Sequence, residues 1–468
     1  MDDPAVAAAI AANRFGLGAR PGELARVASD ARGWLGAQLA GAAPRLQDRE
    51  LRGSADILSQ ALELRRERRD ARSGGAPQNT DATAVMKIGQ FYKPIYAEET
   101  TARVRAALTT DRPFIERLIY FWTNHFAVSA DKVAVLGLAG SFEREVIRPH
   151  VLGNFTDLLL ASTRHPAMLL YLDNQTSVGA NSMLALRAER HASEHRFGIN
   201  ENLAREILEL QTLGVAGGYT QADVTSFAKV ITGWSIGGQS LGHFTGGVPG
   251  QFTFRSEMHE PGVQVVLGKR YTQDGEEQGI AVLRDLARRP ATANFVATKL
   301  ARHFIADEPP PGAVEQLARA FRDSSGDLPT VYRTLIGLKE CWTQALAKFK
   351  TPGDYIISSL RGLQIPQSYA DKARISFALL GQRIFAPGSP AGWPDRSADW
   401  DGASAVMKRI EWADALGQKM GTHQDAALLA PQWLGAAMSA ATHTSIARAA
   451  SGSQALTLLL TAPEFMRR

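Results

Sequence analysis

The sequence predicts a mainly α protein: a large single-domain helical fold with a small β-hairpin insertion near residues 232–272. Along most of the chain, apolar residues recur at the three- and four-residue spacing of amphipathic helices. Residues that favour helix ends stand where this spacing starts and stops; Thr220 precedes one such segment and Gly214 follows another. Residues that favour strands are concentrated in one glycine-rich segment.

Helix-end residues support the individual helices. Pro113 suits a first turn, because its missing N–H would have no intrahelical partner there. Thr220 is a good N-cap, and Asp223 favours the positive end of the helix that follows. The expected helices cover residues 3–13, 22–40, 55–72, 81–109, 113–128, 138–150, 154–172, 200–213, 220–231, 276–289, 291–306, 312–323, 328–338, 353–363, 371–381, 402–417, 424–438 and 444–461.

Two short runs predict strands, QFTFR at 251–255 and VQVVL at 263–267, and we expect the β-hairpin here. Stretches rich in glycine, proline or polar residues predict loops at 73–80, 173–199 and 386–401.

The composition, 45% hydrophobic and 21% charged, is that of a globular protein. We predict one helical domain over residues 1–468, within which residues 1–110 could form an N-terminal helical subdomain. Cys341 is the single cysteine, so an intramolecular disulfide is excluded, and its apolar neighbours indicate a buried side chain.

Charge and hydropathy exclude some classes of partner. The net charge of +5, from 52 basic and 47 acidic residues, is small and not clustered, so we expect no nucleic-acid partner. No stretch approaches the ~20 apolar residues of a membrane span. The start, MDDPAVAAAIAANRFGLG, carries acids where a signal peptide carries bases. We therefore expect a soluble, cytoplasmic protein and leave periplasmic export with a partner open.

The helix beginning near Asn200 carries the most suggestive polar residues. Its N-terminus would attract an anionic group. At about 100° per residue, five polar side chains share one face. They are Glu201, Asn202, Arg205, Glu206 and Glu209. Two interpretations stay open: a solvated face whose i,i+4 ion pairs contribute a few tenths of a kcal/mol each, or a carboxylate-lined site.

Three other residues are candidates for the same site. Asp173 follows a strongly apolar helix at the mouth of a loop, where binding residues are common. His259 lies in the glycine-rich segment and could act as an acid–base group or a ligand. His125 lies in the aromatic run FWTNHF, which is more typical of a hydrogen-bonded core residue, and we keep it as a candidate binding residue.

The run HASEH places His191, Glu194 and His195 at the spacing of inverted zinc proteases. We predict no zinc site, because the run lies in an expected loop and no third ligand follows it. The identity of any metal stays unknown. The sequence contains no P-loop, dinucleotide-binding glycine motif, nucleophile elbow or Cys-x-x-Cys.

Several distinctive stretches are spread from one end of the chain to the other. They are AANRFGLGARPGEL near the start, FWTNHFAVS at 121–129, VIRPHVLGNFTDLLLASTRHPAMLLYLDN at 146–174, NENLAREILELQTLGVAGGYTQADV at 200–224, TGW at 232–234, MHEPG around His259, ANFVATKLARHF at 293–304, KFKTPGDYIISSLR at 348–361, GWPDRSADW at 392–400 and the terminal APEFMRR. Together they resemble the large bacterial family catalogued as domain of unknown function 1800 (DUF1800).

The resemblance implies no established reaction, substrate or cofactor. Members of that family look to be encoded beside a secreted, sulfatase-like family, which implies such a protein as a partner. One departure is Gln211, where the family usually has histidine in LELHTLG. Because glutamine cannot take up a proton at neutral pH, either this position is structural or this member is altered.

Two hypotheses follow. In the first, the chain is an enzyme or metal-binding protein with hydrolytic or transfer chemistry and an oxygen-ligated divalent cation. Its catalytic residues would be Glu206, Glu209, His259 and Asp173, and its ligand-binding residues would be Asn200, Glu201, Asn202, Arg205 and His125. In the second, it is a non-catalytic binding or assembly protein acting with a secreted or surface partner, with Trp393–Trp400 as contacts. Convergence of the polar residues on one pocket would favour the first.

Overall fold

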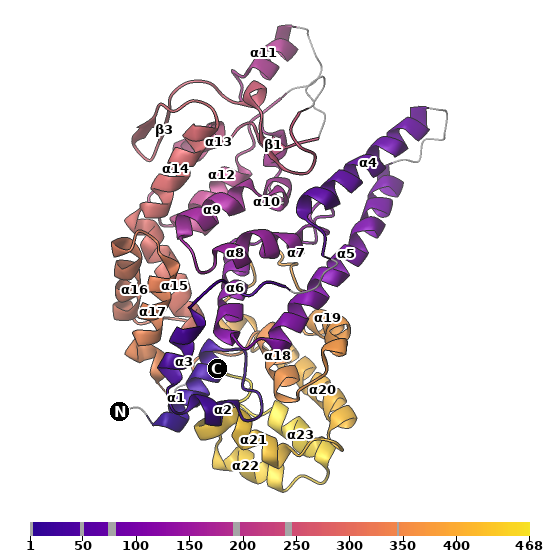
Figure 1. Cartoon of the computed structure of the whole chain (residues 1–468), viewed down its shortest axis with the longest axis vertical. Helices are drawn as coiled ribbons and strands as arrows, with labels where there is room; N and C mark the ends of the chain where they lie inside the picture. Colours follow the sequence, from indigo (N-terminus) through magenta and orange to yellow (C-terminus); the bar gives the residue numbers. More distant parts are fainter. Residues whose placement is uncertain (1–2, 47–50, 74–80, 191–196, 239–245, 344–345) are drawn as a thin grey trace.

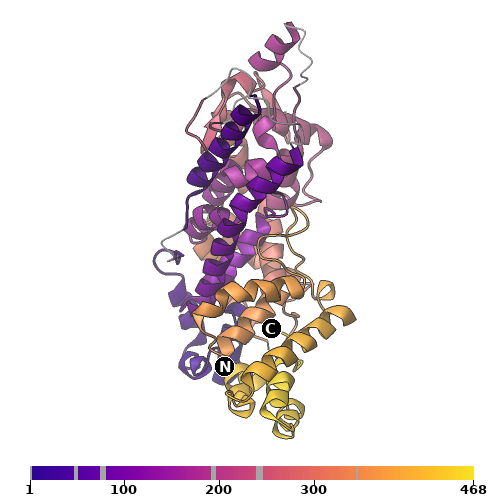
Figure 2. The same ribbon diagram turned by 90° about the vertical axis from the view of Figure 1, so that its right-hand side faces the viewer.

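A computed structural model describes residues 3–46, 51–73, 81–190, 197–238, 246–343 and 346–468. Nearly all regular structure in these residues is helical, with two small antiparallel sheets, so the predicted fold class is confirmed (Figure 1). Both termini lie in the lower half of the molecule, beside the C-terminal helices (Figure 2).

The N-terminal part contains three short helices and a long helical pair that projects from the body (Figure 1). The bounds are α1 Pro4–Ile10, α2 Glu23–Val27, α3 Ala31–Gln38, α4 Ser54–Ser73 and α5 Asp81–Thr109. A π-helical turn, Ala11–Phe15, continues α1. The predicted loop at 73–80 lies almost wholly outside the described residues, apart from Ser73, which ends α4.

Helix α6 is the buried centre of the structure. One face of α6 carries Phe114, Leu118 and Trp122, all fully buried. The Trp122 indole N–H donates to the Tyr332 hydroxyl at 2.6 Å, which donates to the Val151 carbonyl at 3.0 Å. The middle helices are α6 Pro113–His125, α7 Ala139–Phe142, α8 Arg148–His150, α9 Phe155–Arg164, α10 Pro166–Tyr171, α11 Met183–Arg190, α12 Asn202–Glu206 and α13 Gln221–Val230.

Two details of the middle region differ from the predictions. The expected loop at 173–199 contains α11, whose Leu184 is buried against Val178 and Met258. The two expected strands do not pair with each other. The strands are β1 Trp234–Ile236, β2 Phe252–Phe254, β3 Gln264–Val266 and β4 Lys269–Tyr271, and they form the separate pairs β1–β2 and β3–β4. Strand pairing depends on distant residues, which local propensity does not encode.

The C-terminal half returns to helices, as predicted. The bounds are α14 Glu276–Arg288, α15 Pro290–Phe304, α16 Pro311–Asp323, α17 Leu328–Gly337, α18 Pro352–Gly362, α19 Ala370–Leu379, α20 Ala403–Met420, α21 Ala426–Leu434, α22 Ala440–Ala447 and α23 Gly452–Leu460. One contiguous hydrophobic cluster extends from Val6 to Met466 and includes side chains of the first 110 residues. The division of the chain into domains stays a prediction.

A buried ion cluster fixes α6 against the helices that follow it. The Arg148 guanidinium binds both carboxylate oxygens of Glu116 at 2.8 and 3.0 Å, and it also donates to Glu143 at 3.0 Å. Arg103 from α5 reaches Glu143 at 2.8 Å. The side chains of Arg148, Glu116 and Glu143 are almost fully buried, so each charge depends on its partners.

We expect Glu116→Gln to destabilise the protein by about 3 kcal/mol, because it leaves the buried Arg148 with one carboxylate instead of two. Urea unfolding followed by circular dichroism measures the change. The control is Glu315→Gln, which removes an exposed carboxylate near Arg319 and Arg322 and should change the stability by less than about 0.5 kcal/mol. Equal unfolding midpoints for the two variants would contradict the prediction.

Candidate functional site

The predicted polar face near Asn200 lies on α12 and the π-helical turn Ile207–Thr212 that continues it. Arg205 binds Glu201 at 3.0 Å, and Glu201 also accepts hydrogen bonds from Thr225 and Gln221. Glu201 therefore joins α12 to α13. Asn202 begins α12, and its N–H donates to the Asn200 side chain at 2.9 Å.

Glu209, which also stands four residues from Arg205, makes a different contact from the expected i,i+4 ion pair. The Tyr219 hydroxyl donates to Glu209 at 3.1 Å. The wider π-helical turn begins at Ile207 and changes the direction of the side chains after Arg205. Burial raises the pKa of Glu206, and the neighbouring charge of Glu209 raises it further.

Asp173 and Asn200 are brought together. The Asn200 amide donates to the Asp173 carbonyl at 3.3 Å, and the Asp173 carboxylate binds Lys132 at 2.7 Å. Asp173 has a φ of 57°, a left-handed conformation that aspartate tolerates better than most residues. Its side chain is half exposed.

The two predicted histidines are buried. Nδ1 of His259 lies 3.1 Å from the Thr232 carbonyl, and burial lowers the pKa of His259. Nε2 of His125 lies 3.0 Å from the Gln211 carbonyl, and burial holds the pKa of His125 well below its usual value. The Gln211 side chain is buried, with its amide 3.8 Å from the sulfur of Met168. Position 211 thus lies in the core of this chain.

The contacts of these residues do not gather all of them around one ligand, and none of them lines either of the two cavities described below. Their role in a site stays a prediction. His191, Glu194 and His195 lie outside the described residues. Within the described ranges, no group of three or more His, Cys, Asp or Glu side chains is arranged to hold a metal ion. In the same ranges, no helix is both long and apolar enough to cross a bilayer.

A different set of residues surrounds a cavity of about 110 Å³, which we call cavity 1. Its wall is formed by α5, α6, α15, α18, α19 and the segment 382–395. Aromatic rings line one part, and ionisable side chains line another: Tyr120, Phe121, Phe377, Phe385 and Trp393 with Arg103, Arg117, His303, Asp354, Arg383 and Asp395. A concave, largely apolar surface with a few converging polar groups is the usual form of a small-molecule site.

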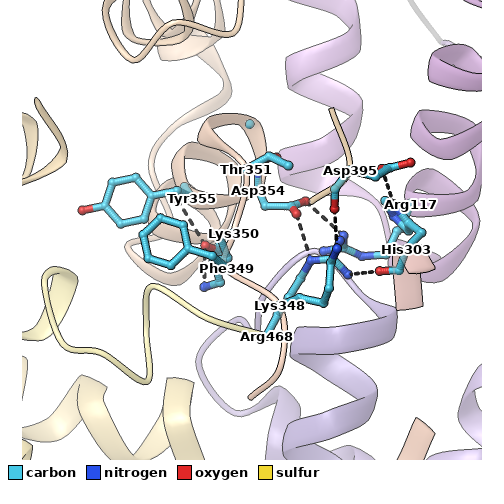
Figure 3. Close-up of polar contacts among 12 residues, drawn as sticks. Arg117, His303, Lys348, Phe349, Lys350, Thr351, Asp354, Tyr355, Asp395 and Arg468 are labelled. Atoms are coloured by element: carbon cyan, nitrogen blue, oxygen red, sulfur yellow. Dashed lines mark hydrogen bonds and ion pairs between the residues drawn. The ribbon is translucent and has the colours of Figure 1, made fainter. Parts of the chain in front are cut away.

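Asp354 is the charged centre of this region (Figure 3). Arg117 donates to its Oδ1 at 3.0 Å, and Nε of Arg468 lies 2.9 Å from its Oδ2. All three side chains are at least 90% buried. Burial raises the pKa of Asp354, but the two guanidinium groups outweigh burial and hold this pKa well below its usual range. Burial lowers the pKa of Arg117 to about 10.

His303 forms a pair with Asp395 beside this centre. Nδ1 of His303 lies 3.4 Å from Oδ1 of Asp395, a long contact of the kind that catalytic groups show before substrate binds. Burial and the charge of Arg468 lower the pKa of His303 to about 4, so the ring is neutral at pH 7. An ionised carboxylate only accepts hydrogen bonds, so Nδ1 carries the proton. Nε2 is then an acceptor, and it is buried without a hydrogen-bond partner among the residues that the structure describes.

The segment that carries Asp395 is held in place by α6 and by Lys348. The Asn124 side chain donates to the Trp393 carbonyl at 2.8 Å and accepts from its N–H at 2.7 Å. Lys348 donates to the Asp395 carbonyl and to Asp307. Gly392 has a φ of 82° and lies so close to Asn124 that a Cβ would come within 2.4 Å of its carbonyl oxygen. Glycine is therefore required at position 392.

Burial also raises the pKa of Asp395, but its bond to His303 and the charges of Lys299 and Lys348 lower it to about 2. Strongly shifted pKa values thus cluster at cavity 1, which is typical of functional sites.

The structure is that of a helical protein with a buried charged pocket. Residues 10–467 match the model of the DUF1800 family, described as a protein of unknown function, so the chain belongs to that family. No curated protein and no solved structure matches the chain.

Sequence reasoning missed the residues of cavity 1. His303, Asp354 and Asp395 lie in three of the stretches that carry the family resemblance, at 293–304, 348–361 and 392–400. Phe304, Tyr355 and Pro394 stand next to His303, Asp354 and Asp395, but arginines also flank His303 and Asp395, so the local sequence does not mark all three as buried. No spacing pattern connects the three, because their contacts join different helices and a loop.

We expect acid stability to depend on His303. Its pKa of about 4 in the folded protein is below its unfolded value of 6.5, so the unfolded chain binds the proton more readily. Stability is therefore lost as the pH falls from 6.5 to about 4, by at most about 3 kcal/mol from this group. Urea unfolding at several pH values should give a flatter pH dependence for His303→Gln. His443→Gln, which changes an exposed histidine, should keep the wild-type slope. An unchanged slope for His303→Gln would contradict the prediction.

Proposed function

We propose that this protein is an enzyme that binds a small molecule in cavity 1 and uses His303 as a general base in hydrolytic or transfer chemistry. The observation that carries the proposal is the His303–Asp395 pair: one ring nitrogen is held by a carboxylate, and the other is an acceptor that no described residue engages in a hydrogen bond. Proton abstraction by Nε2 would make the ring cationic, and Asp395 would stabilise that charge.

The walls of cavity 1 fit this role. Tyr120, Phe121 and Trp393 would pack against the apolar part of a ligand. Water is largely excluded, since the side chain of His303 is 12% exposed and that of Asp395 is 21% exposed. Exclusion of water strengthens the interaction between a developing positive charge on His303 and Asp395.

The low pKa of His303 also indicates what a ligand would do. Arg468 and Arg117 both lower this pKa by repulsion. An anionic group of the ligand near these guanidiniums would offset the repulsion and raise the pKa of His303 toward neutrality, where a general base is most effective. This favours a substrate with a negative charge or a strongly polar carbonyl.

A second candidate function, the non-catalytic assembly protein, is favoured by exposed apolar side chains on α19 and α20. Ile375 and Leu379 lie one turn apart on α19 with 66% and 53% exposure, and Met407 on α20 is 55% exposed. The assembly function would require these side chains to belong to one contiguous apolar surface, because such surfaces mark contacts with another protein. The expected sulfatase-like partner would be tested for binding to these side chains of α19 and α20. Trp393 and Trp400 are not candidates for this contact, since Trp393 lines cavity 1 and Trp400 is buried. The cellular location stays a prediction.

We expect the wild-type protein to hydrolyse at least one member of a panel of p-nitrophenyl carboxylate, phosphate and sulfate esters. His303→Gln should reduce kcat/KM by about 100-fold or more, since general base catalysis contributes at least this much. Asp395→Asn should also reduce the rate, because its amide can no longer stabilise the histidine cation. His443→Gln should keep the wild-type rate. Full activity of His303→Gln would overturn the proposal, and inactivity of the wild type toward the whole panel would favour the assembly protein.

A further inference from the structure

A second cavity, of about 200 Å³, lies between α1, α21 and the C-terminal residues; we call it cavity 2. It has no lining residue in common with cavity 1. Val6, Ile10 and Leu434 form an apolar part of its wall, and Lys350 is also a lining residue. The segment around Lys350 is held to the C-terminus, because the Lys350 N–H donates to the Met466 carbonyl at 2.8 Å.

Lys350 is unusual for a buried lysine, because no carboxylate of the described residues lies within ion-pair distance of its amine. Lys350 is 3% exposed. The contacts of Nζ are neutral: it donates to the Ser358 hydroxyl at 3.0 Å and lies 3.9 Å from the centre of the Phe465 ring. Nearby ring and hydroxyl groups only partly replace water around a charged amine.

We propose that cavity 2 binds a small aldehyde or ketone that carries a carboxylate, such as an α-keto acid, and that Lys350 forms an imine with its carbonyl carbon. Desolvated lysines beside other cations are the usual amine nucleophiles of proteins. In the reaction, the amine nitrogen attacks the carbonyl carbon and a carbon–nitrogen double bond forms. The two protons lost by nitrogen leave with the carbonyl oxygen as water, so no oxidant or reductant is needed.

The cationic side chains of cavity 2 favour a ligand that carries a carboxylate. Arg14, Arg467 and Arg468 line it with Lys350, against one carboxylate, Glu464. Glu464 is already used, because it accepts hydrogen bonds from the Ser439 N–H at 3.0 Å and the Thr442 hydroxyl at 2.9 Å. The Arg467 guanidinium lies over the ring of Phe349, and among the described residues it has no ion pair. A ligand carboxylate would supply that pair.

The protonation state of Lys350 agrees with this chemistry. Burial lowers the pKa of Lys350 to about 7, so a large fraction of the amine is neutral and nucleophilic at physiological pH. Asp354 opposes this shift, whereas Arg117, Arg468 and Arg409 add to it. Arg14, Arg467 and Glu464 are the other ionisable groups of the cavity wall.

Borohydride trapping of the full-length protein with pyruvate tests the proposal. We expect one reduced adduct, found on Lys350 by peptide mapping. The yield should rise with pH through about 7 and then level off, whereas labelling of an ordinary lysine still rises near pH 10. Acetone, which has no carboxylate, should need about a tenfold higher concentration for equal labelling, equivalent to one charge-assisted contact.

Lys350→Met should abolish the adduct, and Lys419→Met, which changes an exposed lysine, should leave it unchanged. Thermal unfolding checks that Lys350→Met is folded. His303→Gln should still be labelled, so the failure of cavity 1 as an active site is distinguishable from the failure of cavity 2. An adduct spread over exposed lysines, or equal labelling of Lys350→Met, would overturn the proposal. Equal labelling of Lys350 by acetone and pyruvate would overturn the assignment of a carboxylate.

Discussion

The rest of the site depends on the ion pairs of the buried Asp354 carboxylate. This carboxylate neutralises Arg117 from α6 and Arg468 from the C-terminus, and the backbone N–H of Asp354 donates to the Thr351 hydroxyl at the start of α18. Three separate parts of the chain therefore meet at one charge. Without Asp354, two buried guanidiniums would face each other, and the loss of one partner of such a cluster costs about 3–5 kcal/mol.

The positions of His303 and Asp395 follow from that centre. The Arg468 guanidinium also donates to the His303 carbonyl at 3.0 Å, so the same cation orients the end of α15. The backbone of Arg468 forms hydrogen bonds with the backbone of Lys348, and the Lys348 amine in turn donates to the Asp395 carbonyl. The His303–Asp395 pair is thus supported from both sides by a backbone that a buried ion cluster fixes. Support of this kind holds reacting groups in place before a ligand arrives.

Local patterns in the sequence predicted what depends on local spacing. The helices, the Thr220 N-cap and the Arg205–Glu201 pair all join residues three or four positions apart, and the structure contains each of them. The Glu209 contact with Tyr219 was not predicted, because the π-helical turn after Glu206 changes the spacing. The β pairing and cavity 1 depend on contacts between distant residues. A single sequence shows that Asp354 is a charge among apolar neighbours, but it does not show which guanidiniums neutralise it.

Lys350 and Asp354 lie four residues apart in the segment 348–355, and their surroundings have opposite effects on their charges. Asp354 has two guanidinium partners, so it stays ionised although it is buried. Lys350 contacts a hydroxyl and an aromatic ring, so the effect of burial on its pKa is only partly offset, by the charge of Asp354, and its amine loses the proton near neutral pH. Arg117 and Arg468 both bind Asp354, and both repel the protonated amine of Lys350. The same two buried arginines thus keep the carboxylate beside cavity 1 charged and favour the neutral amine in cavity 2.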